Sequence, residues 1–242
     1  MIQVGFKTDK GKMRDNNEDS LFIMNEENIF IVADGVGGHN SGQLASSTAV
    51  KIISEYIKTN PIQKNLKNHE FRSYFLQCLK EANGIIYNMA NHSIENAGMA
   101  TTAVILFISD EKAYCINVGD SRAYIIRDGK IKQITDDHTY VNELFKEGSI
   151  TRAEVETHPH KNMITRALGA ELNILPDFFE MSIYRNDIFI LCSDGLHGEV
   201  SYEEICRVTN EASSMDALSN DLINLANNKG GSDNITVICL KI

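Results

Sequence analysis

The stretch Ile29-Phe30-Ile31-Val32-Ala33-Asp34-Gly35 is an apolar run that ends in an acid and a glycine. Three further acids border similar runs: Asp120 after residues 115–119, Asp194 after residues 188–193, and Asp233 before residues 235–240. Short apolar runs of this kind are typical of buried β-strands. A carboxylate at the edge of a buried sheet is costly unless its charge is compensated, and several together raise one another's pKa. The pattern therefore predicts strand ends that gather acids around a divalent cation.

An Asp-Gly pair taken alone is more often a tight hairpin turn than a functional site, and Asp128-Gly129 is interpreted as such a turn. The other two pairs have a different context. Asp34-Gly35 is followed by Val36-Gly37-Gly38-His39 and then a helical pattern, and Asp194-Gly195 leads through Leu196-His197-Gly198 into another. Neither pair returns into a strand, which favours a functional role for both acids.

Periodicity in the rest of the chain indicates the fold class. Amphipathic helices, each burying one stripe, are predicted at residues 44–56, 71–89, 202–208 and 215–227. Strands are predicted at residues 29–33, 103–108, 114–118, 123–126, 188–192 and 235–240. Because strands and helices come in blocks rather than in strict alternation, antiparallel sheets with helices packed outside are favoured. We therefore expect an α+β fold built in layers.

The length and composition are those of a globular protein. The chain has 242 residues, of which 43% are hydrophobic and 23% charged. No stretch resembles a linker, so we predict a single domain over residues 1–242. Residues 138–169 are polar and mixed, with a short helix expected at 141–147, and are interpreted as a mobile flap beside a site.

Charge, cysteine usage and the N-terminal sequence narrow the cellular setting. Residues 1–19 lack the apolar segment of a secretory signal, and no later run is long enough to span a bilayer, so a cytoplasmic location is expected. The five cysteines lack any C-x-x-C pairing, which favours reduced core thiols over disulfides or zinc ligands. The net charge of -10 opposes non-specific binding to nucleic acid or anionic membranes.

The segment Arg14-Asp15-Asn16-Asn17-Glu18-Asp19 places an arginine shortly before two adjacent acids. This spacing lets the guanidinium and a carboxylate converge on one pocket. Taken alone, the segment is more simply interpreted as a solvated charged loop. Together with the strand-end acids, it supplies a ligand for a phosphate.

Seven motifs in chain order give the sequence a resemblance that spans nearly the whole chain. They are Arg14 to Asp19, Val32-Ala33-Asp34-Gly35-Val36-Gly37-Gly38-His39, Met99-Ala100-Thr101-Thr102, Val118-Gly119-Asp120-Ser121-Arg122, Ile164-Thr165-Arg166-Ala167-Leu168-Gly169, Ser193-Asp194-Gly195-Leu196 and Gly231-Ser232-Asp233-Asn234-Ile235-Thr236. With these motifs the sequence resembles the metal-dependent protein phosphatases (PPM), also called protein phosphatase 2C, in their compact bacterial form. Any one motif would be weak, whereas seven in order are very improbable by chance.

The resemblance implies a four-layer αββα sandwich, in which two antiparallel sheets are flanked by helix pairs and metals lie in a cleft at one end. It also implies roles for matching residues of this chain: Asp34 bridges two metals, Asp194 and Asp233 complete the first, Glu18 and the Gly35 carbonyl hold the second, Asp19 is a nearby acid, Asp120 with Asp194 holds a third, weaker metal, and Arg14 grips the substrate phosphate. The activity implied is that of a protein serine/threonine phosphatase.

Oxygen-rich ligands suit Mn²⁺ or Mg²⁺ better than zinc, so two such ions are expected, with a possible third. No cysteine has the C-x5-R spacing, so thiol catalysis is disfavoured. The general acid is left unassigned. Val36 stands where many eukaryotic family members have a histidine, and His39 is equally interpretable as a catalytic group near the metals or as a structural histidine in a glycine-rich turn.

Two other function classes compete with this interpretation. A non-catalytic relative that keeps the fold as a binding or regulatory module is disfavoured because every expected metal-binding acid is present. A metal-dependent phosphodiesterase or nuclease is disfavoured by the acidic balance and the lack of a basic stripe. By family analogy we expect phosphorylated proteins as substrates, a cognate bacterial Ser/Thr kinase, and a monomer that binds neither nucleic acid nor membrane. We also hypothesise that residues 138–169 influence the choice of phosphoprotein.

Overall fold

Two antiparallel sheets form the centre of the molecule in a computed structural model that describes residues 2–38, 41–62, 68–109 and 111–242. The first sheet has the strand order β1-β11-β10-β7-β8, and the second has the order β2-β3-β5-β6-β9, with β4 paired to β3. The strands of the first sheet are β1 (Gln3–Asp9), β7 (Arg122–Arg127), β8 (Lys130–Gln133), β10 (Ile188–Cys192) and β11 (Ile235–Lys241). Those of the second are β2 (Asp19–Met24), β3 (Ile29–Val36), β4 (Ala100–Thr101), β5 (Ala103–Ser109), β6 (Lys112–Val118) and β9 (Asp177–Ser182).

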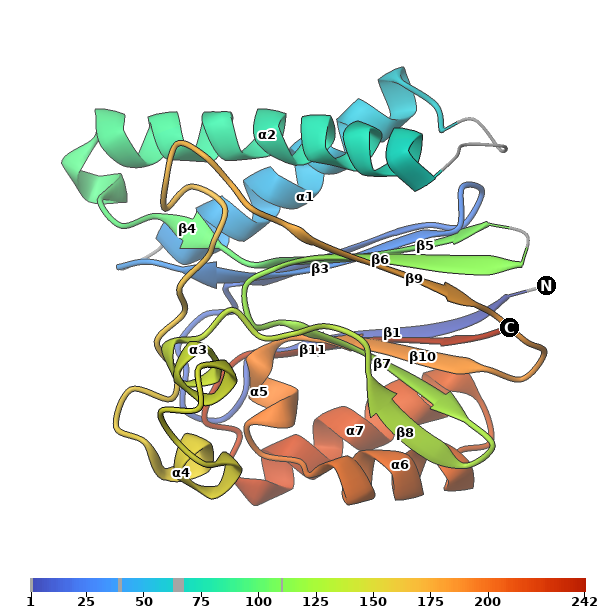
Figure 1. Cartoon of the computed structure of the whole chain (residues 1–242). Helices are drawn as coiled ribbons and strands as arrows, with labels where there is room; N and C mark the ends of the chain where they lie inside the picture. Colours follow the sequence, from blue (N-terminus) through green and yellow to red (C-terminus); the bar gives the residue numbers. More distant parts are fainter. Residues whose placement is uncertain (1, 39–40, 63–67, 110) are drawn as a thin grey trace.

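Helices cover the outer face of each sheet, as Figure 1 shows. The second sheet is covered by α1 (Ser41–Thr59) and α2 (Asn68–His92), and the first by α6 (Tyr202–Glu211) and α7 (Met215–Lys229). The remaining helical segments are η1 (Ile94–Asn96), α3 (Tyr140–Lys146), α4 (Arg152–Thr157) and α5 (Asp194–His197). The four predicted amphipathic helices and the αββα layering are therefore confirmed.

The core consists of three apolar layers, and β3 contributes side chains to two of them. Phe30 and Val32 pack in the layer between the two sheets, whereas Ile29, Ile31 and Ala33 pack in the layer beneath α1 and α2. Alternate side chains of a strand point to opposite faces, so a strand buried on both sides needs apolar residues throughout. The unbroken run at the start of β3 meets this requirement.

The structure adds strands for which the sequence analysis gave no range, namely β1, β2, β4, β8 and β9. β1 and β9 are edge strands, and Gln3–Asp9 has one fully buried position. An edge strand with partly solvated faces does not need an apolar run, so composition alone does not reveal it. The expected hairpin at Asp128-Gly129 is confirmed: it joins β7 to β8, and both residues have positive φ.

The expected flap contains two helices rather than one. The predicted helix at 141–147 corresponds to α3, and α4 follows it after a capping box at Thr151 and Glu154. α4 has no buried residue, so it lacks the apolar stripe by which the other helices were recognised. Both helices lie beside the end of the sandwich at which β4 stands (Figure 1).

Two expectations about the chain's chemistry can be compared with the described residues. All five cysteines are free, and four of them are buried, as expected of core thiols. Within the described ranges, no helix combines the length and apolarity that a membrane crossing requires.

Candidate metal centre

The register of the sheets brings the strand-end acids to one end of the sandwich. Asp19, at the start of β2, pairs directly with Asp34 near the end of β3. β6 runs parallel to β3, because both pair antiparallel with β5, so Asp120 follows β6 at the same end. The sequence thus places these three carboxylates at the end of one sheet, although 101 positions separate Asp19 from Asp120 in the numbering.

The other sheet contributes two more acids at that end. Cys192, the last residue of β10, pairs with Val237 on β11 and with Arg122 at the start of β7. Asp194 comes two residues after Cys192 and opens α5, while Asp233 comes two residues before β11 begins. Both acids therefore lie where β10 ends and β11 starts.

The acids lie close enough for their charges to raise one another's pKa. Burial raises the pKa of Asp34 well above its ordinary value, and the charges of Asp19, Asp194, Asp120 and Asp233 raise it further. Burial also raises the pKa of Asp19 to about 7, against the effect of a hydrogen bond from Ser193. Carboxylates crowded in this way cannot all remain ionised without a compensating cation.

The pKa values of Asp120 and Asp194 are raised as well. Burial raises the pKa of Asp120 to about 8, with Asp194 as the next contributor. Burial likewise raises the pKa of Asp194 to about 6, with the charge of Asp233 adding to the effect and a hydrogen bond with Asp34 opposing it. With pKa values near 7 and 8, Asp19 and Asp120 retain much of their proton near neutral pH when no cation is bound.

Hydroxyl side chains from other motifs hold the two central acids in place. The backbone N–H of Asp34 donates to the Thr102 hydroxyl at 2.9 Å, and the Thr101 hydroxyl donates to the Asp34 carbonyl at 2.8 Å. The Ser193 hydroxyl donates to Oδ2 of Asp19 at 2.7 Å. The sequence analysis gave these hydroxyls no role, although each lies in a quoted motif beside or between the acids.

Glu18 and the Gly35 carbonyl lie together against the start of α1. A Cβ added to Gly42 would stand 2.1 Å from Oε2 of Glu18 and 2.8 Å from the Gly35 oxygen. A Cβ on Gly35 would in turn stand 2.1 Å from the Gly42 carbonyl oxygen. The two glycines therefore allow β3 and α1 to approach closely enough for a carboxylate and a carbonyl oxygen to share one small space.

Arg14 reaches the same centre from the N-terminal loop. Its Nη2 donates to Oδ2 of Asp233 at 2.6 Å, and both side chains are partly exposed. This hydrogen bond is the main reason that the pKa of Arg14 is raised, and the charges of Asp194 and Glu18 add to it. The loop is held by Asn234, whose side chain accepts from the Glu18 N–H at 2.7 Å and donates to the Asn16 carbonyl at 2.9 Å.

The donor set fits a hard divalent cation. Oδ1 of Asp19 and Oδ1 of Asp194 are buried without a hydrogen-bond partner, and Mg²⁺ or Mn²⁺ prefers carboxylate and carbonyl oxygens of this kind. Among the described residues, no three Asp, Glu, His or Cys side chains are already arranged to hold an ion. Instead, Asp233 bonds to Arg14 and Asp19 bonds to Ser193, so an ion that binds here must displace part of these contacts.

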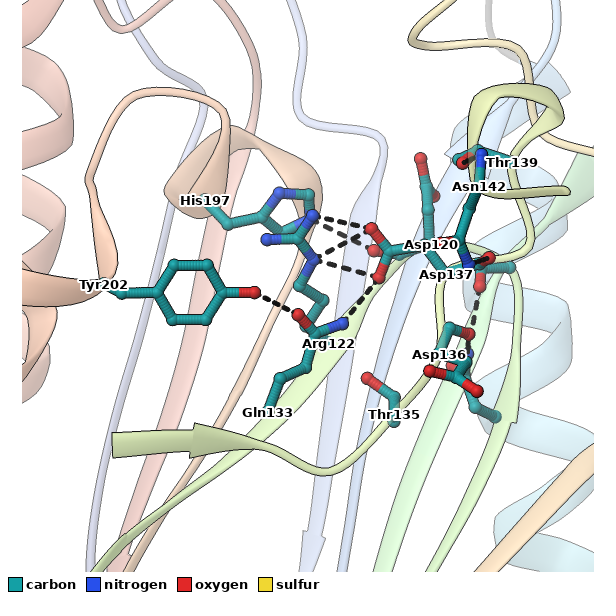
Figure 2. Close-up of polar contacts among 12 residues, drawn as sticks. Asp120, Arg122, Gln133, Thr135, Asp136, Asp137, Thr139, Asn142, His197 and Tyr202 are labelled. Atoms are coloured by element: carbon teal, nitrogen blue, oxygen red, sulfur yellow. Dashed lines mark hydrogen bonds and ion pairs between the residues drawn. The ribbon is translucent and has the colours of Figure 1, made fainter. Parts of the chain in front are cut away.

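A second polar cluster lies beside Asp120, and Figure 2 shows it in close-up. Arg122 forms a paired hydrogen bond with Asp137, from Nε to Oδ1 at 2.9 Å and from Nη2 to Oδ2 at 2.6 Å. Gln133 donates to the same carboxylate at 2.8 Å, and the Tyr202 hydroxyl donates to Gln133. The sequence analysis assigned no role to Asp137. The cluster ties β7 to the segment that leads into α3.

His197, which lies beside the site, is neutral. Nε2 of His197 donates to the Asp120 carbonyl at 3.0 Å, and burial lowers the pKa of this ring to about 3. His197 therefore orients the Asp120 backbone and does not supply a proton near neutral pH. His39 lies outside the described residues, so its suggested catalytic role stays a prediction.

In sequence, the chain is similar to known phosphatases. The family model described as protein phosphatase 2C matches residues 11–235. A serine/threonine phosphatase named stp from Listeria monocytogenes is 35% identical over 239 residues, which covers 98% of this chain and 94% of the relative.

Solved structures agree with the fold. The serine/threonine phosphatase of S. agalactiae has a TM-score of 0.92 and 33% identity, with 100% of both chains covered. The catalytic domain of the phosphatase PstP, in complex with two manganese ions, has a TM-score of 0.85 and 29% identity, and covers 99% of this chain and 97% of that one.

Proposed function

Because the chain belongs to the protein phosphatase 2C family, we propose that it is a protein serine/threonine phosphatase whose strand-end acids hold two divalent cations. It is a metal-dependent hydrolase of phosphate monoesters. The observation that carries the proposal is that Asp19, Asp34 and Asp194 crowd into one cluster, in which one carboxylate oxygen of Asp19 and one of Asp194 are buried without a hydrogen-bond partner. A cluster of this kind costs free energy unless cations neutralise it, so a structural role alone does not account for it.

Each acid has a role in this proposal. Asp34, whose pKa is raised by the charges of the other strand-end aspartates, would contribute to both ion sites, and Asp194 and Asp233 would complete the first. Glu18 and the Gly35 carbonyl would hold the second ion, and Asp19, which pairs with Asp34 across β2 and β3, would be a supporting acid. Asp120 and Asp194 are the candidates for a third, weaker ion. The manganese-bound relative supports two Mn²⁺ ions, and the oxygen donors suit Mg²⁺ equally.

When bound, two cations would lower the pKa of a water molecule and neutralise charge on the phosphoryl oxygens. The protein contributes the binding and the orientation of the substrate. Arg14 has five N–H donors, so its bond to Asp233 leaves donors for two phosphate oxygens. A guanidinium beside the cluster also attracts the anionic substrate to an otherwise acidic protein.

The leaving serine or threonine oxygen needs a proton. His197 is excluded as its source because its ring is neutral and its Nε2–H is engaged by a carbonyl. His39 is retained as a candidate from the sequence. The acid is best identified from the pH dependence of the reaction in a His39→Gln variant, which would lose the alkaline limb, the fall in rate as the acid deprotonates, if His39 donates the proton.

In the cell, we propose that this single domain acts as a cytoplasmic monomer on phosphorylated proteins, opposite a Ser/Thr kinase. Relatives named serine/threonine phosphatase from several bacteria support this setting. A phosphoproteome compared with and without the protein tests it, because sites of the opposing kinase should gain occupancy when the phosphatase is absent.

The activity itself is tested with a phosphothreonine peptide, Mn²⁺ and the purified full chain. Release of phosphate should require Mn²⁺ or Mg²⁺ and stop when a chelator is added. An oligonucleotide in a parallel assay should remain intact. Hydrolysis of the oligonucleotide with no release from the phosphopeptide would contradict the assignment.

A further inference from the structure

A cavity of about 420 Å³ lies beside the metal centre and takes no part in the chemistry described above. Its lining is mainly apolar and comes from the ends of β3, β4 and β6 and from residues 164–175: Val36, Ala100, Val118, Ile164, Ala167, Ala170, Ile174 and Leu175. The volume is within the range of sites that bind small molecules or side chains. We refer to this cavity as the apolar pocket.

The position of the apolar pocket ties it to the acids. Val36 follows Asp34 by two residues on the continuous strand β3, whose register with β4 is regular to its end. Side chains two apart on a strand share a face and are separated by about 7 Å. Val118 likewise precedes Asp120 by two residues. A peptide that presents a phosphate to the acids therefore passes the apolar pocket within two or three residues, since each extended residue spans about 3.4 Å.

The exposure of the lining indicates what the apolar pocket binds. Val36 is 41% exposed and Leu175 is 71% exposed, so both have apolar surface that an entering group could cover. The charged residues on the lining are Glu143, Arg166 and Glu171, and the Arg166 guanidinium bonds to Asp177 at 3.2 Å. Two glutamates at an apolar opening oppose phosphate and acidic side chains and favour an apolar residue with neutral or basic neighbours.

We propose that the apolar pocket receives an apolar side chain of the substrate, located one to three residues from the phosphorylated serine or threonine. The proposal rests on the phosphatase function and specifies its substrate class. Covering Val36 and Leu175 with a leucine or methionine side chain buries apolar area that a serine would leave solvated. The gap of two strand positions between Asp34 and Val36 sets how far along the peptide that side chain stands.

Phosphothreonine peptides that differ at one position test the proposal. A parent peptide of serine and glycine around the phosphothreonine is compared with variants that carry one leucine at each place from three before to three after it. The full chain is assayed with Mn²⁺, and kcat/KM for each peptide is divided by that for p-nitrophenyl phosphate, which has no flanking residues. One or two leucine positions should raise this ratio about tenfold.

Substitutions in the lining then test whether the apolar pocket is the source of the leucine preference. Ala170→Phe adds bulk from an exposed position into the apolar pocket, and Leu175→Ser removes exposed apolar surface from it. Both should reduce the leucine preference to about twofold or less. Leu172→Ser is the matched control, because Leu172 is 66% exposed on the same segment but does not line the apolar pocket, and it should retain the full preference.

The outcomes separate this inference from the phosphatase function. Equal ratios at every leucine position in the unaltered protein would overturn the pocket assignment, even if all the phosphopeptides were hydrolysed. So would a preference that survives both Ala170→Phe and Leu175→Ser. Failure to hydrolyse any phosphopeptide or p-nitrophenyl phosphate would instead refute the proposed function on which the inference depends.

Discussion

The backbone N–H of Gly119 donates a 3.0 Å hydrogen bond to Nδ1 of the buried His138. A backbone N–H can only donate, so Nδ1 is unprotonated and the neutral ring carries its proton on Nε2, 3.2 Å from Oδ2 of Asp177. Burial lowers the pKa of His138, which keeps the ring in this state. Gly119, the residue before Asp120, is thereby linked to Asp177 on β9 through the imidazole of His138.

Substitutions at His138 should show how much its hydrogen bond with Gly119 contributes to stability. His138→Asn can still accept from Gly119 near the Nδ1 position, whereas His138→Ala leaves a buried N–H unpaired at a cost of about 1–3 kcal/mol. Urea unfolding should therefore rank the unaltered protein, Asn and Ala in decreasing stability. His92, an exposed histidine at the end of α2, provides the control, since His92→Ala should change stability by less than about 0.5 kcal/mol. Equal loss in the Asn and Ala variants would contradict the role given to Nδ1.

Asp34→Asn should abolish activity and stabilise the metal-free protein. Activity should fall by about a thousandfold or more, because a bridging carboxylate contributes several kcal/mol through the metals it holds. Asp34 is coupled to four other acids, so a neutral amide relieves repulsion and should raise the midpoint of thermal unfolding in chelator by about 2 °C for each kcal/mol relieved. Asp221→Asn, an exposed change on α7, should alter neither property. A lowered midpoint in Asp34→Asn would mean that Asp34 is needed for folding.

The stability of the metal-free protein should fall as pH rises above neutrality. The pKa of Asp19 is about 7 and that of Asp120 about 8 in the folded protein, against about 3.9 in an unfolded chain. Across this window the folded state holds more protons than the unfolded state, so deprotonation favours unfolding. Because the pKa of His197 is lowered in the folded protein, its effect is to make stability rise with pH below its ordinary pKa of about 6.5. Stability should therefore be compared between about pH 7 and about pH 8.5, where this effect is small.

Binding of Mn²⁺ should stabilise the protein more as pH rises, which is opposite to the pH dependence of the metal-free protein. Cation binding needs deprotonated carboxylates, so the rise in the unfolding midpoint that Mn²⁺ produces should be larger at about pH 8.5 than at about pH 7. Differential scanning calorimetry with Mn²⁺ or with chelator measures both effects. A metal-free midpoint that increases over this pH range would contradict the raised pKa values on which the prediction rests.

The sequence predicted the layered fold because its central strands are buried on both faces. β3, β5, β6, β10 and β11 consist mostly of apolar residues, and all five were predicted. β1 and β9 at the edges, and the solvated α4, carry mixed residues that any loop could have. Burial therefore decided which elements could be recognised.

The acids of the site could be predicted because each follows or precedes an apolar run. Their supports could not be, because they depend on three-dimensional neighbours. Asp137 is paired with Arg122 only because β7 and the segment after β8 lie side by side, and Gly42 is required only because Glu18 lies against it. A single sequence gives the spacing along the chain and not these contacts.

The Arg122–Asp137 pair should contribute more to stability than ordinary surface pairs. Its side chains are 17% and 14% exposed, and the Arg122 charge lowers the pKa of Asp137 although burial alone would raise it. Asp137→Asn and Arg122→Gln should each cost about 3 kcal/mol, because each leaves a buried charge without its partner. The double variant should cost less than the sum. In the exposed pair Arg207 and Glu211, the same changes should cost below about 0.5 kcal/mol. Additive losses at Arg122 and Asp137 would show that the two charges are not coupled.

Gly42→Ala tests the second metal position without substituting any of the proposed ligand residues. The new methyl group would overlap Oε2 of Glu18 and crowd the Gly35 carbonyl, and the flexible glutamate is the group that can move away. We therefore expect Mn²⁺ affinity, measured by calorimetric titration, to fall about tenfold, as it does when groups that orient metal ligands are disturbed. Gly84→Ala is the matched control, because a Cβ on Gly84 meets no atom within 4 Å in the middle of α2. It should leave Mn²⁺ affinity unchanged and raise stability by about 0.5–1 kcal/mol through helix propensity. Unchanged Mn²⁺ affinity in Gly42→Ala would remove Glu18 and the Gly35 carbonyl from the metal centre, since the added methyl cannot coexist with the observed position of that carboxylate.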